Sequence, residues 1–151
     1  MKRFNFKLEN VLRYRETLES LAKNTYSEAL RILNTEKKHL QDLETSRNEL
    51  MLAYNIKAGA IVHPNTLTFI ARYTSQLLLL IDRQKRLIRE KERIVKEKFE
   101  DWNKKRKDVK VIERLKEKKW KEYQREVDKE DQKFQDEIFI AKKIREMEAA
   151  P

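Results

Sequence analysis

The side chains of this chain that could bind a metal or transfer a proton are few and far apart. Its two histidines, His39 and His63, have no cysteine or carboxylate partner at the spacing that a metal site needs, and the chain contains no cysteine. Its single glycine excludes a glycine-rich phosphate loop. We therefore predict that His39 lies at the edge of a helical seam and His63 in a loop, and we expect no enzyme activity, no catalytic residue, no cofactor and no metal site.

The composition indicates long helices rather than a layered globular fold. Charged residues make up 41 % of the 151 positions, with one glycine and two prolines. Such a charge-rich sequence with almost no turn residues is typical of coiled coils. No apolar run exceeds five residues, as in "LLLLI" at 77–81, so we expect no direct membrane insertion and no signal-peptide core. With the absence of cysteine, this predicts a protein of a reducing, cytoplasmic compartment.

Apolar residues recur at helical spacing along both halves of the chain. The second half has apolar residues seven positions apart, at Ile81, Ile88, Val95, Trp102 and Val109. A sustained seven-residue repeat is typical of a coiled coil. In the first half, steps of three, four or seven predict one buried face, which comprises Val11, Leu18, Ala22, Ala29, Leu33, Leu40, Leu43, Leu50 and Tyr54. We predict one helix over about 6–57 and a second over about 66–146.

The apolar seam of the second helix is thin. Three residues after its apolar positions stand Gln84, Lys91, Lys98 and Lys105, where a strong coiled coil would place apolar side chains. We therefore expect the pairing of the two helices to be only modestly stable.

The segment 58–65 carries the signals of a reversal between the two helices. Gly59 suits the left-handed position just past a helix end, and Pro64 disfavours a helical conformation at His63. Asn65 or Thr66 could then cap the next helix. These signals favour an all-α, antiparallel two-helix coiled-coil hairpin that forms one domain over 1–151. The alternative is a single continuous helix that is kinked at this segment.

The position of the turn sets which residues face one another. With the turn centred near residues 61–62, residue i lies opposite roughly residue 123 − i. The second helix then outlasts the first, and residues 119–151 form an unpaired overhang that includes Trp120, Phe134 and Ile138. We expect this overhang to be disordered alone or to dock on a partner.

The tip of the hairpin is apolar. Residues 50–81 include 20 apolar residues and only two charged ones, Lys57 and Arg72. Two helices and a turn cannot bury all of these side chains, and a contiguous exposed apolar patch usually marks a partner surface. The alternative is that the loop folds back and covers part of the patch.

The net charge of +10 is concentrated in one segment. Residues 83–125 carry 19 basic and 9 acidic residues, whereas residues 126–151 carry 5 basic and 8 acidic ones. A basic segment can bind nucleic acid, but a bZIP-type basic region is nearly free of acids. The acids interspersed here favour an acidic protein surface as the partner, and many of the charges can form i,i+4 pairs on solvated helix faces.

Three stretches of the chain carry a resemblance to a known family: the opening "FNFKLENVLRYRETLESLA", the segment "FEDWNKKRKDVKVIERLKEKK" and the closing "DKEDQKFQDE". By these motifs the chain resembles the FliJ-type proteins of the flagellar type III export apparatus. The order and spacing of the motifs extend the resemblance over nearly the whole chain.

The resemblance implies a fold and several partners. Members of that family form an antiparallel two-helix coiled coil like that of the gamma subunit of ATP synthases. They insert the end that carries both termini into the hexamer of the flagellar export ATPase, bind the cytoplasmic domain of the export gate membrane protein, and escort export chaperones. The resemblance therefore implies a cytoplasmic protein peripherally associated with the inner-membrane export apparatus, with no catalytic residue and no nucleic acid partner.

Two sets of residues then become candidate binding sites. The predicted ATPase-binding residues are basic and lie near the termini: Arg13, Arg15, Arg106, Lys110, Arg114 and Lys118. The predicted gate-binding residues lie toward the tip: Leu43, Leu50, Tyr73, Leu77, Leu80 and Gln84. Three alternatives stay open, namely the equivalent stalk of a virulence-type secretion system, a basic nucleic-acid-binding coiled coil, and a self-associating structural coiled coil.

Overall fold

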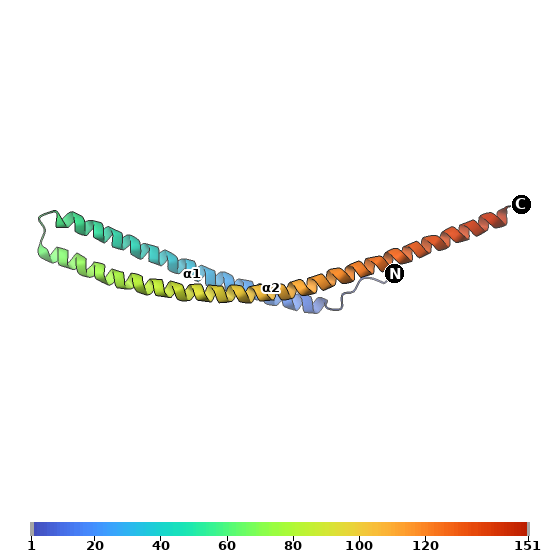
Figure 1. The fold of residues 1–151 in the computed structure, drawn as a ribbon, viewed down its shortest axis with the longest axis horizontal. Helices are drawn as coiled ribbons and strands as arrows, with labels where there is room; N and C mark the ends of the chain where they lie inside the picture. The colour runs from blue at the N-terminus through green and yellow to red at the C-terminus, as the bar shows by residue number, and fades with distance from the viewer. Residues whose placement is uncertain (1, 151) are drawn as a thin grey trace. The chain divides into compact units, whose positions relative to one another are not determined.

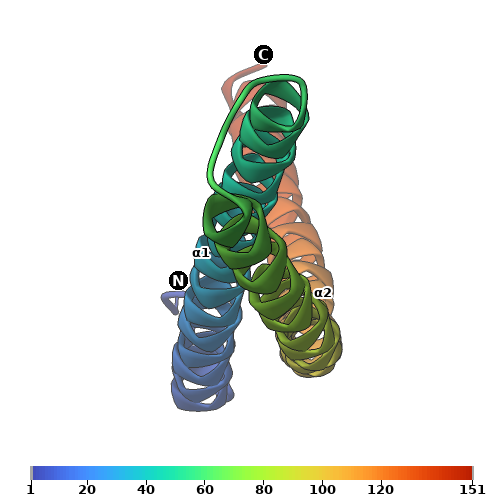
Figure 2. The same cartoon turned by 90° about the vertical axis from the view of Figure 1, so that its left-hand side faces the viewer.

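The computed structural model describes residues 2–150 and contains two long α-helices. Helix α1 runs Glu9–Ala58 and α2 runs Pro64–Ala149, with a short non-helical connection at 59–63 (Figures 1 and 2). The predicted all-α helical hairpin is confirmed, and the kinked continuous helix is excluded. The contacts of the chain divide it into two compact units, described separately below: unit 1 comprises residues 1–18 and 105–151, and unit 2 comprises residues 19–104.

The end of α1 differs from the prediction for Gly59. The Ala60 N–H donates to the carbonyl of Lys57 at 3.1 Å. No residue among the described positions, Gly59 included, has a positive φ, so the prediction of a left-handed glycine is wrong. A Cβ built on Gly59 would lie 3.7 Å from the carbonyl oxygen of Ile56, which is an ordinary contact. Because the turn closes without left-handed backbone, it does not require glycine here.

The start of α2 is set by His63 and Pro64. Pro64 occupies the first helical position, where a missing N–H costs nothing. The Asn65 N–H donates to Nδ1 of His63 at 3.2 Å, and the Thr66 N–H donates to the carbonyl of His63 at 3.0 Å. The capping residue is therefore His63, and the predicted cap at Asn65 or Thr66 is wrong.

Unit 2 is held together by the predicted seam. Ile81 and Ile88 of α2 are buried, as are Ala22 and Leu33 of α1. Gln84 is the one buried polar residue among those that the structure describes. Its Nε2 donates to the backbone carbonyl of Glu36 at 2.9 Å and to the carboxylate of Glu36 at 2.6 Å. The polar position in the seam is thus satisfied by hydrogen bonds, which limits its cost.

An aromatic cluster extends the same seam within unit 2. The rings of Tyr26 and Trp102 stack with centroids 5.4 Å apart, and Phe99 lies 5.5 Å from Tyr26. The indole Nε1 of Trp102 donates to the carboxylate of Glu19 at 2.8 Å. These contacts join α1 to α2 beside the cationic seam positions Lys91 and Lys98.

Unit 1 has a separate apolar core. Its buried members are Phe6 from the segment before α1, Leu12 of α1, and Val109 and Ile112 of α2. The prediction that Val11 lies on the buried face is wrong, because Leu12 takes that place and Val11 is exposed. The half-buried Leu8 lies one helical turn before Leu12, so the buried face near the start of α1 follows residues 8, 12 and 15.

The antiparallel register is confirmed by contacts inside each unit. In unit 1, Nη1 of Arg15 donates to the carbonyl of Asp108 at 3.1 Å, which is the residue that the rule 123 − i predicts. Lys116 forms an ion pair with Glu9 at 2.8 Å, two positions from its predicted place. In unit 2, the contact of Gln84 with Glu36 falls three positions from its predicted place.

The first residues of the chain pack further along α2 than the sequence predicts. The ring of Phe4 lies 5.0 Å from that of Trp120, and the Tyr123 hydroxyl donates to the carbonyl of Lys2 at 2.9 Å. Residues 119–123 therefore have neighbours, and the exposed stretch of α2 covers 128–150. Between residues 2 and 150, neither helix has a segment apolar enough to cross a bilayer.

Candidate functional site

The strongest charged feature of unit 1 is a row of three basic residues on α2. Lys110, Arg114 and Lys118 are exposed and follow one another at four-residue intervals. This spacing places them on one face of the helix, over a length of about 12 Å. We name these three residues the basic stripe. None of the three takes part in a salt bridge within the described residues 2–150.

The other three predicted ATPase-binding residues are engaged within the chain. Arg15 is half-buried and bonded to the Asp108 carbonyl. Arg13 is exposed and lies 4.0 Å from the carboxylate of Glu9. Arg106 is half-buried and already has an interaction inside the chain. All six residues belong to unit 1, but only the basic stripe presents its charges without a partner.

Three acidic residues near the stripe form salt bridges with other lysines. Glu117 pairs with Lys121 at 3.3 Å, and Glu122 pairs with Lys119 at 3.4 Å. Glu9 of α1 pairs with Lys116. Residues 1–18 and 105–125 together carry 15 basic and 6 acidic residues, a net charge of +9. This part of unit 1 therefore presents a positive surface suited to an acidic partner.

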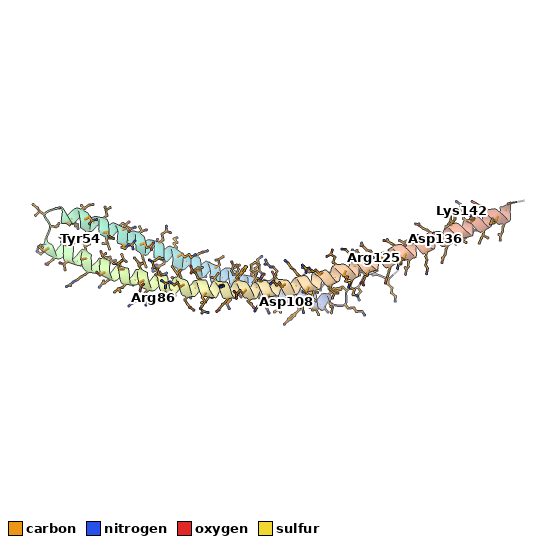
Figure 3. All side chains as sticks on the ribbon, in the orientation of Figure 1. Tyr54, Arg86, Asp108, Arg125, Asp136 and Lys142 are labelled. Carbon is orange, nitrogen blue, oxygen red and sulfur yellow. The ribbon has the colours of Figure 1, made fainter. Side chains whose placement is uncertain are left out.

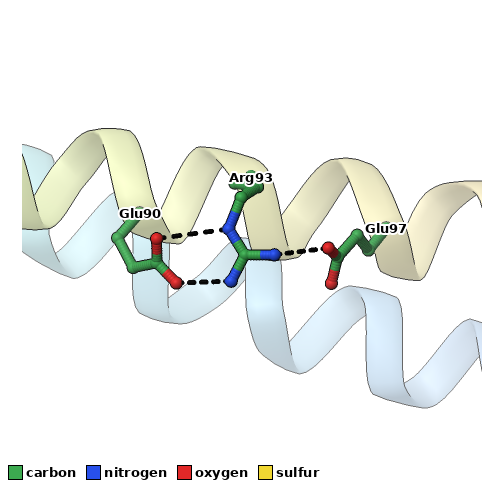
Figure 4. A network of polar contacts seen from close by, with 3 residues as sticks. All are labelled: Glu90, Arg93 and Glu97. Atoms are coloured by element: carbon green, nitrogen blue, oxygen red, sulfur yellow. Dashed lines mark hydrogen bonds and ion pairs between the residues drawn. The ribbon is translucent and has the colours of Figure 1, made fainter.

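In unit 2, several arginines are held by acidic residues on the same helix. Arg93 bonds Glu90 in a bidentate manner, at 3.2 Å from Nε and 2.5 Å from Nη2, and its third nitrogen bonds Glu97 (Figure 4). The hydrogen bond from Arg93 lowers the pKa of Glu90 and raises the pKa of Arg93. Arg31 lowers the pKa of Glu28 in the same way. Arg86 pairs with Asp82 at 2.5 Å.

The tip of unit 2 exposes many large apolar side chains. Among them are Tyr54, whose place near the loop Figure 3 labels, Ile56 and the fully exposed Ile61. Across the connection, Phe69 and Tyr73 of α2 are exposed and stack with ring centroids 6.4 Å apart. The loop does not cover this patch.

The predicted gate-binding residues do not share one surface. Tyr73 and Leu80 are exposed, each at 47 %. Leu43 and Leu50 of α1 are half-buried. Leu77 and Gln84 are buried in the seam against α1, with Leu77 only 4 % exposed, so a partner cannot reach them while the hairpin is closed. The seven-residue period could have separated these two from Leu80, since 77 and 84 fall on the seam row and 80 does not.

Sequence reasoning did not identify one feature of unit 1, the groove beside the first residues. A groove of about 450 Å³ lies between residues 4–8 and α2, and its lining includes Phe4, Leu8, Leu115 and Tyr123. Lys116 lies over the ring of Phe6 at 6.0 Å. The two phenylalanines ahead of α1, Phe4 and Phe6, were the signal in the sequence that this segment packs on the hairpin. Which residues of α2 they contact depends on how far the non-helical segment reaches.

No group of three or more residues among positions 2–150 could hold a metal ion. The expected loop position of His63 is confirmed, since its ring nitrogen caps α2.

Comparisons with known proteins give a consistent result. A family model described as "Flagellar FliJ protein" matches residues 4–148. Among solved structures, the chain is similar to one described as a YscO homolog from Chlamydia trachomatis, with a TM-score of 0.60 and 18 % sequence identity. That match covers 98 % of this chain and 100 % of the other chain, and at this identity it concerns the fold alone. No curated protein matches the chain.

Proposed function

Because the chain belongs to the family of flagellar FliJ proteins, and is thus a component of flagellar type III protein export, we propose that it is a non-enzymatic stalk that binds the hexamer of the export ATPase through unit 1. The observation that carries this proposal is the basic stripe, three exposed cations without a salt-bridge partner among the described residues. Unit 1 also contains both ends of the chain, which are the ends that the family resemblance directs into the ring.

Electrostatics supports an acidic ring surface as the counterpart of the stripe. Its three charges are already exposed and unpaired, so binding breaks no ion pair within the chain. An unpaired cation gains more from an acidic partner than one that must first leave a salt bridge. Long-range attraction also raises the association rate, and this effect falls with ionic strength.

We assign the contact with the export gate to the exposed face of the tip. Tyr73 and Leu80 are accessible on α2, and Leu78 and Leu79 beside Leu80 are exposed as well. An apolar patch with only Lys57 and Arg72 as charges suits an apolar protein surface. Escort of export chaperones is part of the same proposal and rests on family membership alone.

The test of the ATPase contact uses charge reversal with a matched control. In the first variant Lys110, Arg114 and Lys118 become Glu. In the control, three other exposed basic residues of α2 that lie in unit 2, Lys85, Arg89 and Lys96, become Glu. The two variants change the net charge equally, so only the location of the charges differs.

The expected result is that the stripe variant no longer stimulates the purified export ATPase, whereas the control stimulates it as the wild type does. Far-UV circular dichroism checks that both variants keep their helix content. Full stimulation by the stripe variant, or an equal loss in both variants, would show that the stripe is not the contact. Binding of RNA with a steep salt dependence, without any ATPase stimulation, would favour the nucleic-acid alternative.

The gate contact is tested by Leu80→Asp, because Leu80 is exposed and its replacement leaves the seam intact. We expect weaker binding to the cytoplasmic domain of the gate protein and unchanged ATPase stimulation. Gate binding at wild-type strength would contradict the assignment.

A further inference from the structure

The last part of α2 carries an exposed apolar row that no other segment of the described chain covers. Residues 128–150 are all exposed, and Phe134 is 64 % exposed. At 3.6 residues per turn, Val127, Phe134, Ile138 and Ala141 fall within a strip about 60° wide. We name these four residues the terminal row. Asp136 and Lys142 project from this part of the helix in Figure 3.

The terminal row continues a face of α2 that is already used in unit 1. Trp120 and Tyr123, against which Phe4 packs, fall in the same strip. The packing by the first residues stops there, and Val127 is the last half-buried residue. Together with the polar Asp131 and Arg145, the terminal row has the alternating three- and four-residue spacing of a coiled-coil seam.

We propose that the terminal row is the surface on which a second copy of this chain docks, so that residues 127–145 of two copies pair as an antiparallel coiled coil. A pairing centred near residue 136 places Phe134 of each copy against Ile138 of the other. The contact is isologous, because each copy offers the same row to its partner.

The charges along this stretch support the antiparallel direction. Residues 126–137 contain six acidic and two basic residues, whereas residues 138–150 contain three basic and two acidic ones. In the antiparallel pairing Asp128 lies near Lys142 of the other copy, while Asp131 lies opposite Ala141 and Arg145 opposite Val127. A parallel pairing would place each of these charged residues beside the same residue of the other copy, and the two like charges would repel.

The same geometry predicts that the pairing is weak and reversible. The row is short, the seam that it forms also includes the charged Asp131 and Arg145, and Glu137 of each copy lies near the centre beside its counterpart. An interface of this size is expected to have a dissociation constant on the order of tens of micromolar. The pairing does not rest on the ATPase proposal, because it leaves the basic stripe and the tip exposed.

Sedimentation of the full chain over about 5–500 µM tests the pairing, a range that brackets the expected affinity. We expect a monomer–dimer equilibrium that Ile138→Asp weakens at least tenfold. The matched control is Phe139→Asp, since Phe139 is also exposed but lies outside the row, beside Lys143. A monomer at every concentration, or a dimer that Ile138→Asp leaves unchanged, would overturn the proposal.

Charge exchange tests the partners without removing apolar contacts. Asp128→Lys and Lys142→Asp should each weaken the dimer several-fold, and the double variant should restore it, because both contacts return with their signs exchanged. Asp136→Arg on the opposite face is the control and should have no effect. A double variant weaker than both single variants would overturn the assigned pair.

Disulfide trapping tests the direction, and the absence of cysteine removes any background. Val127→Cys chains mixed with Arg145→Cys chains should cross-link, whereas Val127→Cys alone should not, because its two copies would lie about 27 Å apart. Efficient cross-linking of Val127→Cys with itself would indicate a parallel pair and overturn the proposal.

Discussion

Unit 1 and unit 2 are built from the same two helices, but they use their charges differently. Unit 2 carries 16 basic and 12 acidic residues, and Arg31, Arg86 and Arg93 each have an acidic partner three or four positions away. Lys110, Arg114 and Lys118 in unit 1 each follow another basic residue by four positions. The spacing of opposite charges, more than the number of basic residues, decides whether a helix can offer charge to a partner.

The two units also differ in what their surfaces leave exposed. Unit 2 places a hydrogen-bonded Gln84 inside the seam and large apolar residues outside it at the tip. Unit 1 buries an aromatic and aliphatic core and exposes cations. Each unit therefore stabilises the pairing of α1 and α2 with a thin interior, and the two differ in the side chains that they expose beside it.

The largest effect is expected from the seam of unit 2. Leu77→Ala should lower the free energy of unfolding by about 2–4 kcal/mol, because it removes a buried side chain and leaves a cavity. Leu80→Ala, on the exposed face, should cost less than about 1 kcal/mol. Urea unfolding followed by far-UV circular dichroism measures both values. Equal losses of unfolding free energy would contradict the burial of Leu77 and the exposure of Leu80.

The next effect concerns the basic stripe and its dependence on salt. Reversal of Lys110, Arg114 and Lys118 should weaken ATPase binding about tenfold to hundredfold at low ionic strength, mainly through slower association. The difference from the wild type should shrink as salt is raised toward about 0.5 M, because screening removes the long-range attraction. Surface plasmon resonance at several salt concentrations measures this. A loss that does not change with salt would indicate a packing defect instead.

A smaller effect is expected at the polar layer of unit 2. Gln84→Ala and Glu36→Ala should each cost about 1–2 kcal/mol, because each removes a partner from a partly buried hydrogen bond. The double variant should cost less than the sum of the two single costs, since both remove the same side-chain contact. Strict additivity in a double-mutant cycle would contradict the hydrogen bond between these side chains.

The smallest effect is expected from the ion pairs on the surface of unit 2. The pKa of Glu90 is lowered from 4.5 by Arg93, so the pair stabilises the folded chain above about pH 4.5 and this contribution disappears as the pH falls through the lowered pKa. Because the pair is fully exposed, Arg93→Gln should shift the melting temperature by less than about 2 °C at pH 7. The shift should shrink as the pH is lowered and the Glu90 carboxylate becomes protonated. A shift that grows on acidification would have the wrong sign.

Sequence periodicity and turn signals determined most of the fold. The seven-residue repeat identified the buried face of α2 from Ile81 to Val109, and the segment around Pro64 identified the reversal and thereby the register. These features are local, because side-chain spacing and proline geometry act within a few residues of the backbone. The motifs that indicated the family are likewise local stretches of sequence, and their order along the chain could be read without the structure.

The tertiary structure decided which candidate residues a partner can reach. The sequence could not show that Arg15 is bonded to the Asp108 carbonyl while Lys110 is exposed. It also did not show that Phe4 reaches Trp120, because the segment before α1 has no period from which its path could be read. These contacts join residues 93 to 121 positions apart in the sequence, and only the folded chain brings such residues together.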